Sequence, residues 1–313
     1  MSSQPPTDPF AQLLAGVEIP ETADDMRRLL DGFAQLMNAG APEVGAFHEK
    51  VPVAGADPAV TADVVVPKGT GPWPVLVYLH GGGWICGSPK THSKLGHRFA
   101  EGGYLVFNVD YRLAPEHPFP TPLEDCIHAI RWAAKVAGDY GGDATRLAVG
   151  GDSAGGNLSS AAAIALAEDP EVRIAAALLI YGVFDFAKMG EMGAMTDGPT
   201  AANPALAEAG AGLVELMVGS YLGSDRAPSL LADPRVSPIH AAHKLPPSHV
   251  VCGTADPLVA QASDLVEALK KADVDHEHVN VPDMPHGFVQ MEFLPPARES
   301  IDRMLAFLDA RLR

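Results

Sequence analysis

The stretch Arg146-Leu-Ala-Val-Gly-Gly-Asp-Ser-Ala-Gly-Gly-Asn157 changes its character twice within twelve residues. Residues 147–149 form a short apolar run that is typical of a buried strand, and the alanine-rich residues 158–167 are typical of a helix. Between them lies Gly-x-Ser-x-Gly, centred on Ser153. In a strand–turn–helix context this pattern holds a serine in a strained turn above the strand ends. Taken alone, it fits equally well a glycine-rich turn with an idle serine.

Length and composition limit the fold and the partners. The chain has 313 residues, of which 47% are hydrophobic and 19% are charged, enough for one large domain or one domain with an appendage. Its 22 Lys and Arg against 39 Asp and Glu give a formal charge of −17. Because such a surface repels phosphate backbones and anionic headgroups, we expect neither nucleic-acid nor membrane-surface binding. No apolar run reaches the roughly 18 residues that a transmembrane helix needs.

The N-terminus and the cysteines favour a cytoplasmic location. Residues 1–10 lack both the basic start and the apolar core of a signal peptide. The three cysteines, Cys86, Cys126 and Cys252, are too few and too scattered for a disulfide framework or a zinc site. We therefore expect reduced thiols and no metal.

Short apolar segments alternate with helical patterns along most of the chain. Nearly all-apolar strands that alternate with helices indicate a mostly parallel sheet covered on both faces, an α/β fold. The first strands are joined by short links, which favours an antiparallel or mixed edge. The predicted strands are residues 64–66, 75–79, 105–109, 147–149, 175–180, 250–252 and 278–281, and the predicted helices are residues 94–100, 123–136, 158–167, 258–271 and 298–312.

Two regions depart from this alternation. Residues 24–38 carry a helical apolar stripe before the first strand, and residues 185–235 turn into a Met-, Ala- and Gly-rich segment with a helix over residues 205–221. This segment is too long for a simple crossover, so we interpret it as an insertion over the strand ends. The predicted division is 1–50 as N-terminal cap helices, 51–184 and 236–313 as the core, and 185–235 as the cap insertion.

The residues around Ser153 need partners for chemistry, and three other loops supply candidates. After the strand that ends at Leu79 comes His80-Gly-Gly-Gly-Trp84, whose glycines leave backbone N–H groups free to face a ligand. Asp256 and His286 each follow a later strand, and the order Ser, Asp, His is that of the α/β-hydrolases. Polar loops beyond the strands of an open α/β sheet meet at one edge, so these groups predict a nucleophile, its base and its orienter.

Each candidate also has a purely structural interpretation. Asp256 precedes Pro257, which suits a first helical position, so this carboxylate by itself fits a helix N-cap. His286 lies in a Pro/Gly loop rather than on an apolar face, whereas His276 and His278 fall inside a predicted strand and are weaker candidates.

The combination of motifs resembles the bacterial hormone-sensitive-lipase-like esterases over about residues 60–310. The resemblance rests on His80-Gly-Gly-Gly-Trp84, Asp110-Tyr-Arg-Leu-Ala-Pro-Glu-His117, Gly151-Asp-Ser-Ala-Gly-Gly-Asn157, Asp256-Pro-Leu258 and His286-Gly-Phe288. It implies an α/β-hydrolase core with a helical cap, no cofactor, and hydrolysis of carboxylic esters. Homodimers are common among such proteins, but no residue of this chain proves one.

The resemblance and the chemistry predict the same roles. Ser153 attacks the ester carbonyl, His286 accepts its proton, and Asp256 orients the imidazole. The oxyanion is expected to be held by the backbone N–H groups of Gly82, Gly83 and Ala154. We expect a carboxylesterase for short- to medium-chain acyl esters that needs only the small ester and water. The alternatives are an amidase or peptidase that uses the same triad, and a catalytically silent ligand-binding protein of this fold.

Other residues near these motifs are expected to be structural. We expect a buried polar cluster that braces the oxyanion loop, formed by Asp110, Tyr111, Arg112 and Glu116. Asp152 is expected to bond loop backbone rather than to transfer protons, and His80 to support its own loop. Trp84 fits either core packing or a pocket wall, and Cys86 fits a buried, inert thiol better than a reactive one.

Overall fold

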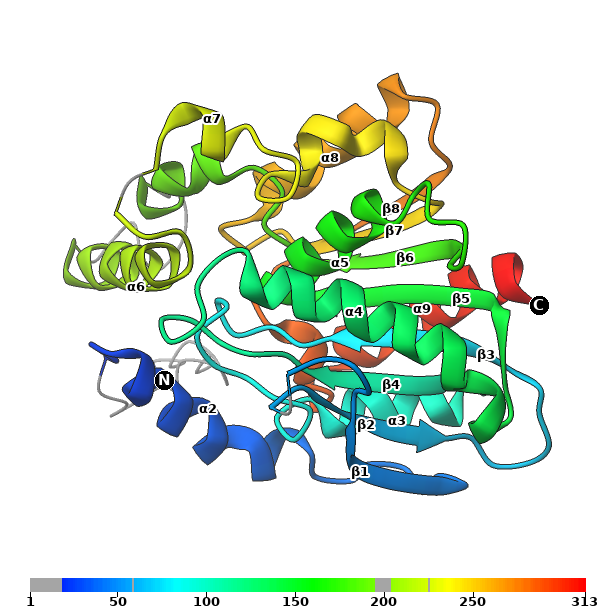
Figure 1. Cartoon of the computed structure of the whole chain (residues 1–313). Coiled ribbons are helices and arrows are strands. Elements are labelled where there is room, and N and C mark those ends of the chain that lie inside the picture. Colours follow the sequence, from blue (N-terminus) through cyan, green and yellow to red (C-terminus); the bar gives the residue numbers. More distant parts are fainter. Residues whose placement is uncertain (1–18, 58, 195–203, 225) are drawn as a thin grey trace, which may run out of the picture.

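In the computed structural model, residues 19–57, 59–194, 204–224 and 226–313 are described, and eight strands within them form one sheet in the order β1-β2-β4-β3-β5-β6-β7-β8 (Figure 1). The strands are β1 (Ala46–Pro52), β2 (Thr61–Val66), β3 (Trp73–Leu79), β4 (Leu105–Asp110), β5 (Gly142–Asp152), β6 (Ile174–Ile180), β7 (Ser248–Gly253) and β8 (His276–Val281).

Strand direction divides this sheet into two parts. β1 pairs antiparallel with β2, and β2 pairs antiparallel with β4. From β4 to β8 every neighbouring pair is parallel. The predicted mostly parallel sheet is therefore confirmed, and its antiparallel pairs lie at the N-terminal edge.

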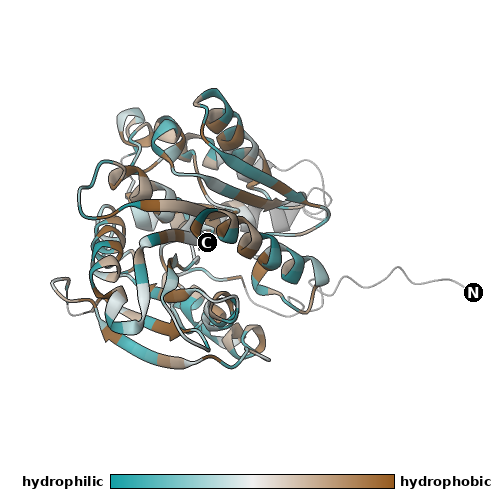
Figure 2. Ribbon diagram, turned by 90° about the vertical axis from the view of Figure 1, so that its right-hand side faces the viewer, coloured by the Kyte–Doolittle hydropathy of each residue, from teal (hydrophilic) through white to brown (hydrophobic). Residues whose placement is uncertain are grey.

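Helices cover both faces of the sheet, as the apolar strands require. α3 (Ser93–Glu101) and α9 (Pro295–Leu312) contact each other and the strands of one face. α4 (Thr121–Val136) packs on α5 (Ala154–Ala165) over the other face, where η3 (Pro238–Lys244) connects α5 with α8 (Val259–Lys271). The peripheral helices carry both hydrophilic and hydrophobic residues, because only one side of each meets the core (Figure 2).

The remaining helices gather near the carboxyl ends of the parallel strands (Figure 1). They are α2 (Ala23–Met37), η2 (Phe186–Ala194), α6 (Pro204–Leu222) and α7 (Pro228–Leu231). Two further short helices lie elsewhere in the chain order: η1 (Ala137–Tyr140) directly precedes β5, and η4 (Phe288–Gln290) precedes α9. α2 begins with a capping box formed by Thr22 and Asp25. Arg27 then fastens α2 to the core, since its guanidinium donates to the carbonyls of Ile85 at 2.8 Å and Ala114 at 3.0 Å.

α6 is joined to the loop that follows β3. The rings of Tyr221 on α6 and Trp84 stack with centroids 4.7 Å apart and an interplanar angle of 5°. The Phe119 N–H also donates to the Tyr221 carbonyl at 2.8 Å. The end of α6 is thus attached to the same loop cluster that α2 reaches from the other side.

Two local expectations differ from the structure. β1 begins at Ala46, inside the segment 1–50 assigned to N-terminal helices, and its mostly exposed side chains lack the apolar run that would have revealed it. Asp256, expected at the start of the helix predicted for residues 258–271, instead lies in a turn over residues 254–258, and α8 begins at Val259, within one residue of that prediction. Residues 1–18 and 195–203 of the proposed cap segments lie outside the described residues.

No helix in the described ranges combines the length and the apolar character that crossing a membrane requires.

Candidate active site

Ser153 lies in a strained turn between β5 and α5. Its backbone has φ 54° and ψ −120°, a conformation that L-residues rarely adopt, and its N–H donates to the Ile180 carbonyl at 2.9 Å. A Cβ on Gly155 would collide with the Leu79 carbonyl, and a Cβ on Gly151 would collide with both Leu79 and Gly155. Glycine is therefore required on both sides of the serine, and the turn predicted from the sequence is present.

The imidazole of His286 lies between Ser153 and Asp256. Its Nε2 is 2.9 Å from Ser153 Oγ, and its Nδ1 is 2.9 Å from Asp256 Oδ2. The three residues come from the loops after β8, β5 and β7, whose parallel register brings these strand ends to one edge of the sheet. The structure thus brings all three candidate residues into one hydrogen-bonded row.

Asp256 uses its two carboxylate oxygens for different purposes. The residue is fully buried, and its Oδ1 accepts the N–H of Leu258 at 2.8 Å while Oδ2 faces His286. The N-cap interpretation is therefore wrong in its details, because the helix begins at Val259 and its N-cap residue is Leu258. The bond to Leu258 instead fixes the carboxylate orientation within the turn.

The surroundings of His286 favour its protonated form. Burial by itself lowers the pKa of this imidazole, but the charge and hydrogen bond of Asp256, aided by the charge of Asp152, outweigh it and raise the pKa above its ordinary value. The Tyr181 ring meets the imidazole edge-on, with centroids 4.9 Å apart. An imidazole whose protonated form is stabilised by its surroundings is suited to accept a proton from a nearby hydroxyl.

The glycine loop after β3 leaves the amides of Gly82 and Gly83 unused. Gly82 has φ 124° and Gly83 has φ 59°, and a Cβ on Gly82 would collide with the backbone of Cys86. Ala154 is the first residue of α5, where helical N–H groups have no partner within the helix. Within the described ranges, no hydrogen bond from the N–H of Gly82, Gly83 or Ala154 to another protein group is observed. These donors are free for an anionic ligand atom.

The loop is braced by Tyr111, not by the cluster expected from the sequence. The Tyr111 ring stacks on His80 with centroids 4.2 Å apart, and its hydroxyl donates to the His80 carbonyl at 2.7 Å. His80 Nδ1 lies 2.8 Å from the Gly81 carbonyl, in agreement with a role within its own loop.

The other members of the expected cluster have different partners. Arg112 pairs with Asp125 of α4 at 2.7 Å, Glu116 is half exposed and pairs with Arg27 at 2.6 Å, and Asp110 faces a separate cavity. The four side chains do not meet because consecutive residues of an extended segment point in opposite directions.

Asp152 forms a buried junction beside the serine. Its Oδ1 accepts the Tyr78 hydroxyl at 2.8 Å and the Gly81 N–H at 3.1 Å. Its Oδ2 lies 3.3 Å from His92 Nε2 and 3.1 Å from Gln290 Nε2. Burial would raise the pKa of this carboxyl, but its contacts with His92 and Tyr78 prevail and lower the pKa to about 2.

The bond from Gly81 to Asp152 agrees with the expectation that this carboxylate holds loop backbone. Three partners of Asp152 were not predicted from the sequence. Tyr78 is a single polar residue in an apolar strand, His92 directly precedes a helix, and Gln290 follows the loop of His286. No spacing pattern marks them. Their common feature, a contact with Asp152, exists only in three dimensions.

Trp84 and Cys86 are structural residues. Trp84 is buried between Tyr221 and Phe186, whose ring centroid is 5.0 Å away, so the packing interpretation holds. Cys86 is also buried, and this burial raises the pKa of its thiol to about 12. A thiol that stays protonated is a poor nucleophile, which agrees with the expected inert cysteine.

In the part of the chain that the structure describes, no group of three or more His, Cys, Asp or Glu side chains is arranged to hold a metal ion.

Comparisons with known proteins agree with this fold. Residues 76–290 match a family described as alpha/beta hydrolase fold. Carboxylesterase NlhH of Mycobacterium tuberculosis is 34% identical over 244 residues, 76% of this chain and 74% of that protein. Ethyl acetate hydrolase of Pseudomonas putida is 33% identical over 223 residues, 69% of this chain and 66% of that protein.

Solved structures of esterases extend the likeness to the full length. An esterase of the bacterial hormone-sensitive lipase family superposes with a TM-score of 0.80 at 32% identity, covering 100% of both chains. A hyperthermophilic esterase from Pyrobaculum calidifontis gives a TM-score of 0.84 at 28% identity and covers 98% of this chain and 99% of its own. The chain therefore belongs to the hormone-sensitive-lipase-like esterases of the α/β-hydrolase fold family.

Proposed function

We propose that this protein is a serine carboxylesterase that hydrolyses short- to medium-chain acyl esters through an acyl-serine intermediate. The observation that carries the proposal is the position of the His286 imidazole, 2.9 Å from Ser153 Oγ on one side and 2.9 Å from Asp256 Oδ2 on the other. A hydroxyl, a base and an oriented carboxylate in this order are the parts that nucleophilic acyl transfer needs.

In the first half of the reaction, Ser153 Oγ forms a bond to the ester carbonyl carbon while its proton passes to His286 Nε2. The carbonyl oxygen becomes an oxyanion that accepts from the N–H groups of Gly82, Gly83 and Ala154. The intermediate collapses as the carbon–oxygen bond to the alcohol breaks, and the imidazolium returns the proton to the leaving alkoxide. In the second half, a water oxygen forms a bond to the acyl carbon while its proton passes to His286 Nε2. The bond from that carbon to Ser153 Oγ then breaks, and the imidazolium returns the proton to Oγ, which releases the carboxylic acid and free Ser153.

Asp256 acts on the imidazole rather than on the substrate. Its Oδ2 keeps a proton on Nδ1, so that Nε2 presents a lone pair to Ser153, and its charge stabilises the imidazolium that forms. The free serine hydroxyl is a weak nucleophile, so this arrangement supplies the activation. Losing one oxyanion donor is expected to cost about a hundred- to a thousandfold in kcat.

The preference for small acyl groups is supported by a relative and by the resemblance. One relative is named for ethyl acetate, an ester of two carbons on each side. We assign substrate selection to the cap insertion, residues 185–235, because α6 lies at the strand ends that carry the site (Figure 1). The Met217 side chain of α6 occupies the space that a Cβ on Gly83 would need, so this helix reaches the oxyanion loop.

The proposal extends to location and assembly. All three cysteines lie in described segments, where they are buried and unpaired, which supports the cytoplasm as location. A homodimer stays an expectation from the resemblance, and size-exclusion chromatography with light scattering tests it.

The direct test measures p-nitrophenyl acetate, butyrate and hexanoate hydrolysis by the wild type and Ser153→Ala. We expect measurable turnover of all three esters by the wild type, and a loss of several orders of magnitude in kcat for the folded variant. Matched anilide and phenyl ester substrates separate the amidase alternative, and covalent labelling by an organophosphate separates the silent-binder alternative. Full activity of Ser153→Ala would refute the proposal.

A further inference from the structure

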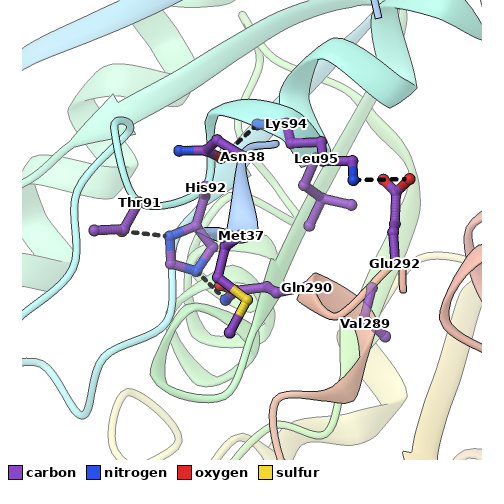
Figure 3. Close-up of a pocket in the computed structure, with 9 residues that line it drawn as sticks. All are labelled: Met37, Asn38, Thr91, His92, Lys94, Leu95, Val289, Gln290 and Glu292. Carbon is purple, nitrogen blue, oxygen red and sulfur yellow. Dashed lines mark hydrogen bonds and ion pairs between the residues drawn. The ribbon is translucent and has the colours of Figure 1, made fainter. Parts of the chain in front are cut away.

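The loop that carries His286 continues into the short helix η4, whose last residue, Gln290, contacts the residue that precedes Ser153. Gln290 lies four residues after His286, and its Nε2 is 3.1 Å from Asp152 Oδ2 and 2.5 Å from His92 Nε2. Figure 3 shows the side chains of Gln290 and His92 pointing toward each other at this junction. Asp152 directly precedes Ser153, so one amide joins the base loop to the nucleophile turn.

The amide has the donors that this junction needs. A glutamine amide nitrogen carries two N–H groups, and one of them can donate to the Asp152 carboxylate while the same nitrogen lies against the His92 ring. His92 Nδ1 faces the Thr91 hydroxyl at 2.8 Å and the Ser88 carbonyl at 3.3 Å. His92 Nε2 also lies 3.3 Å from Asp152 Oδ2, so the amide, the ring and the carboxylate form one buried cluster. Without the amide, the buried Asp152 carboxylate would lose one of its donors.

The junction leaves little room for solvent to replace the amide. The cavity beside Gln290 and His92 has a volume of about 10 Å³, close to the least space that one water occupies. His92 and Asp152 are each only 2% exposed, and Phe288 and Val289, which precede Gln290, are fully buried. Direct side-chain contacts therefore hold these segments together.

We propose that Gln290 is a positioning residue for the esterase reaction: its side-chain amide fastens the His286 loop to Asp152 and thereby holds the imidazole within reach of both Ser153 and Asp256. Gln290 does not touch the substrate. The inference rests on the proposed function, because it concerns the geometry of that same site.

The pH dependence of activity distinguishes positioning from general stabilisation. The groups that face His286 are Ser153 after β5, Asp256 after β7, Tyr181 after β6, and the charge of Asp152 at the end of β5. Asp256 and Asp152 raise the pKa of His286 against the effect of burial. If the loop shifts, the bond to Asp256 weakens and the acid limb of kcat/KM moves to lower pH.

The test replaces Gln290 with methionine, which has a similar length but no donor. In Gln290→Met we expect kcat for p-nitrophenyl acetate to fall about 10- to 100-fold, the range of one lost hydrogen bond to a charged group, with KM little changed. The acid limb should move to lower pH. Titration of active sites with an organophosphate corrects each rate for the amount of competent enzyme.

Glu292→Gln is the matched control, because Glu292 lies two residues further along the same segment. It pairs with Arg98 at 2.8 Å and Lys94 at 3.4 Å, so its loss loosens the segment without touching Asp152. We expect this control to keep the wild-type kcat and acid limb. If Gln290→Met fails to fold, Gln290→Asn, which withdraws the amide by one methylene, serves with the same expectation.

Two results would overturn the positioning role: wild-type kcat and pH profile in the folded Gln290 variant, or equal changes in the Glu292→Gln control. Inactivity of the wild type toward every ester would instead refute the proposed function, so the two failures are distinguishable.

Discussion

Two buried carboxylates flank the reactive serine, and their partners give them different tasks. Asp256, at the carboxyl end of β7, offers one oxygen to the His286 ring and the other to the Leu258 N–H. Asp152, at the end of β5, is instead surrounded by Tyr78, Gly81, His92 and Gln290. The first acts on the base, and the second joins the loops that carry the site.

The comparison shows that burial and charge do not assign a catalytic role. Both side chains are nearly inaccessible, at 0% for Asp256 and 2% for Asp152. What differs is the role of their partners in the proposed reaction. The imidazole next to Asp256 changes its charge with each proton transfer, whereas the groups around Asp152 take no part in proton transfer. Substitutions at the two positions should therefore differ in how much they lower kcat and in whether they also lower stability.

The largest effect is expected for Asp256→Asn. The Leu258 N–H needs an acceptor, so the asparagine oxygen takes the place of Oδ1 and its NH2 group faces His286 Nδ1. The ring must then carry its proton on Nε2, where it cannot accept from Ser153. We expect kcat to fall about 10⁴-fold with the fold intact, as measured by steady-state kinetics and circular dichroism. A loss below tenfold would contradict the role of Asp256.

A smaller effect is expected for Asp152→Asn. The asparagine oxygen can still accept from Tyr78 and Gly81, but its NH2 group meets the donor of Gln290. The loss of one charged hydrogen bond predicts a fall in kcat of about 10- to 100-fold and a lower melting temperature. If Asp152→Asn were as damaging as Asp256→Asn, the distinction between the two carboxylates would be wrong.

The pH dependence of stability also separates the two positions. The pKa of Asp152 is lowered to about 2, so its stabilising contribution is complete above the ordinary pKa of about 4 and is lost as the pH falls through the folded value. Denaturant melts between pH 2 and pH 5 should show a shallower acid loss in Asp152→Asn than in the wild type. Parallel curves would exclude this contribution.

The pH dependence of activity reports the base. The raised pKa of His286 means that the ring becomes protonated, and inactive as a base, at a higher pH than an ordinary histidine near 6.5. kcat/KM should therefore fall on the acid side with a midpoint above about 6.5. In Asp152→Asn the midpoint should move down, since a negative charge near the ring is removed. A midpoint below that of an ordinary histidine in the wild type would contradict this electrostatic account.

The smallest effect is expected at Cys86. This residue lies near the oxyanion loop, but it is bonded to neither carboxylate and has no part in the proposed reaction. With its thiol pKa raised to about 12 by burial, iodoacetamide at pH 8 should leave activity unchanged. Cys86→Ala should keep kcat within about twofold, apart from a modest loss of stability. Rapid inactivation that Cys86→Ala abolishes would show a reactive thiol.

Much of the core could be predicted because its signals are local. Apolar runs marked the parallel strands, and the helices over residues 94–100, 123–136 and 298–312 agree with α3, α4 and α9 to within a few residues. β1 escaped because its side chains are mostly exposed and carry no apolar run. The start of α8 was predicted to within one residue, but Asp256 lies in the turn before the helix rather than at its terminus, because a proline after Asp256 suits either position.

The site divides in the same way. Ser153, Asp256 and His286 could be proposed because each belongs to a short motif after a strand, and parallel topology brings strand ends together. Gln290 and His92 belong to no motif, and only the folded chain places them against Asp152. The expected cluster around Asp110 was wrong because neighbours in sequence were assumed to share partners.

The central claim is that His286 activates Ser153 in preference to every other hydroxyl of the chain. It is tested most directly by mass spectrometry after exposure to a fluorophosphonate. We predict one label per chain, on Ser153, and at least a hundredfold slower labelling in His286→Ala, about the smallest contribution expected of a general base. Label on another residue, or unchanged labelling of Ser153 without the imidazole, would contradict the account.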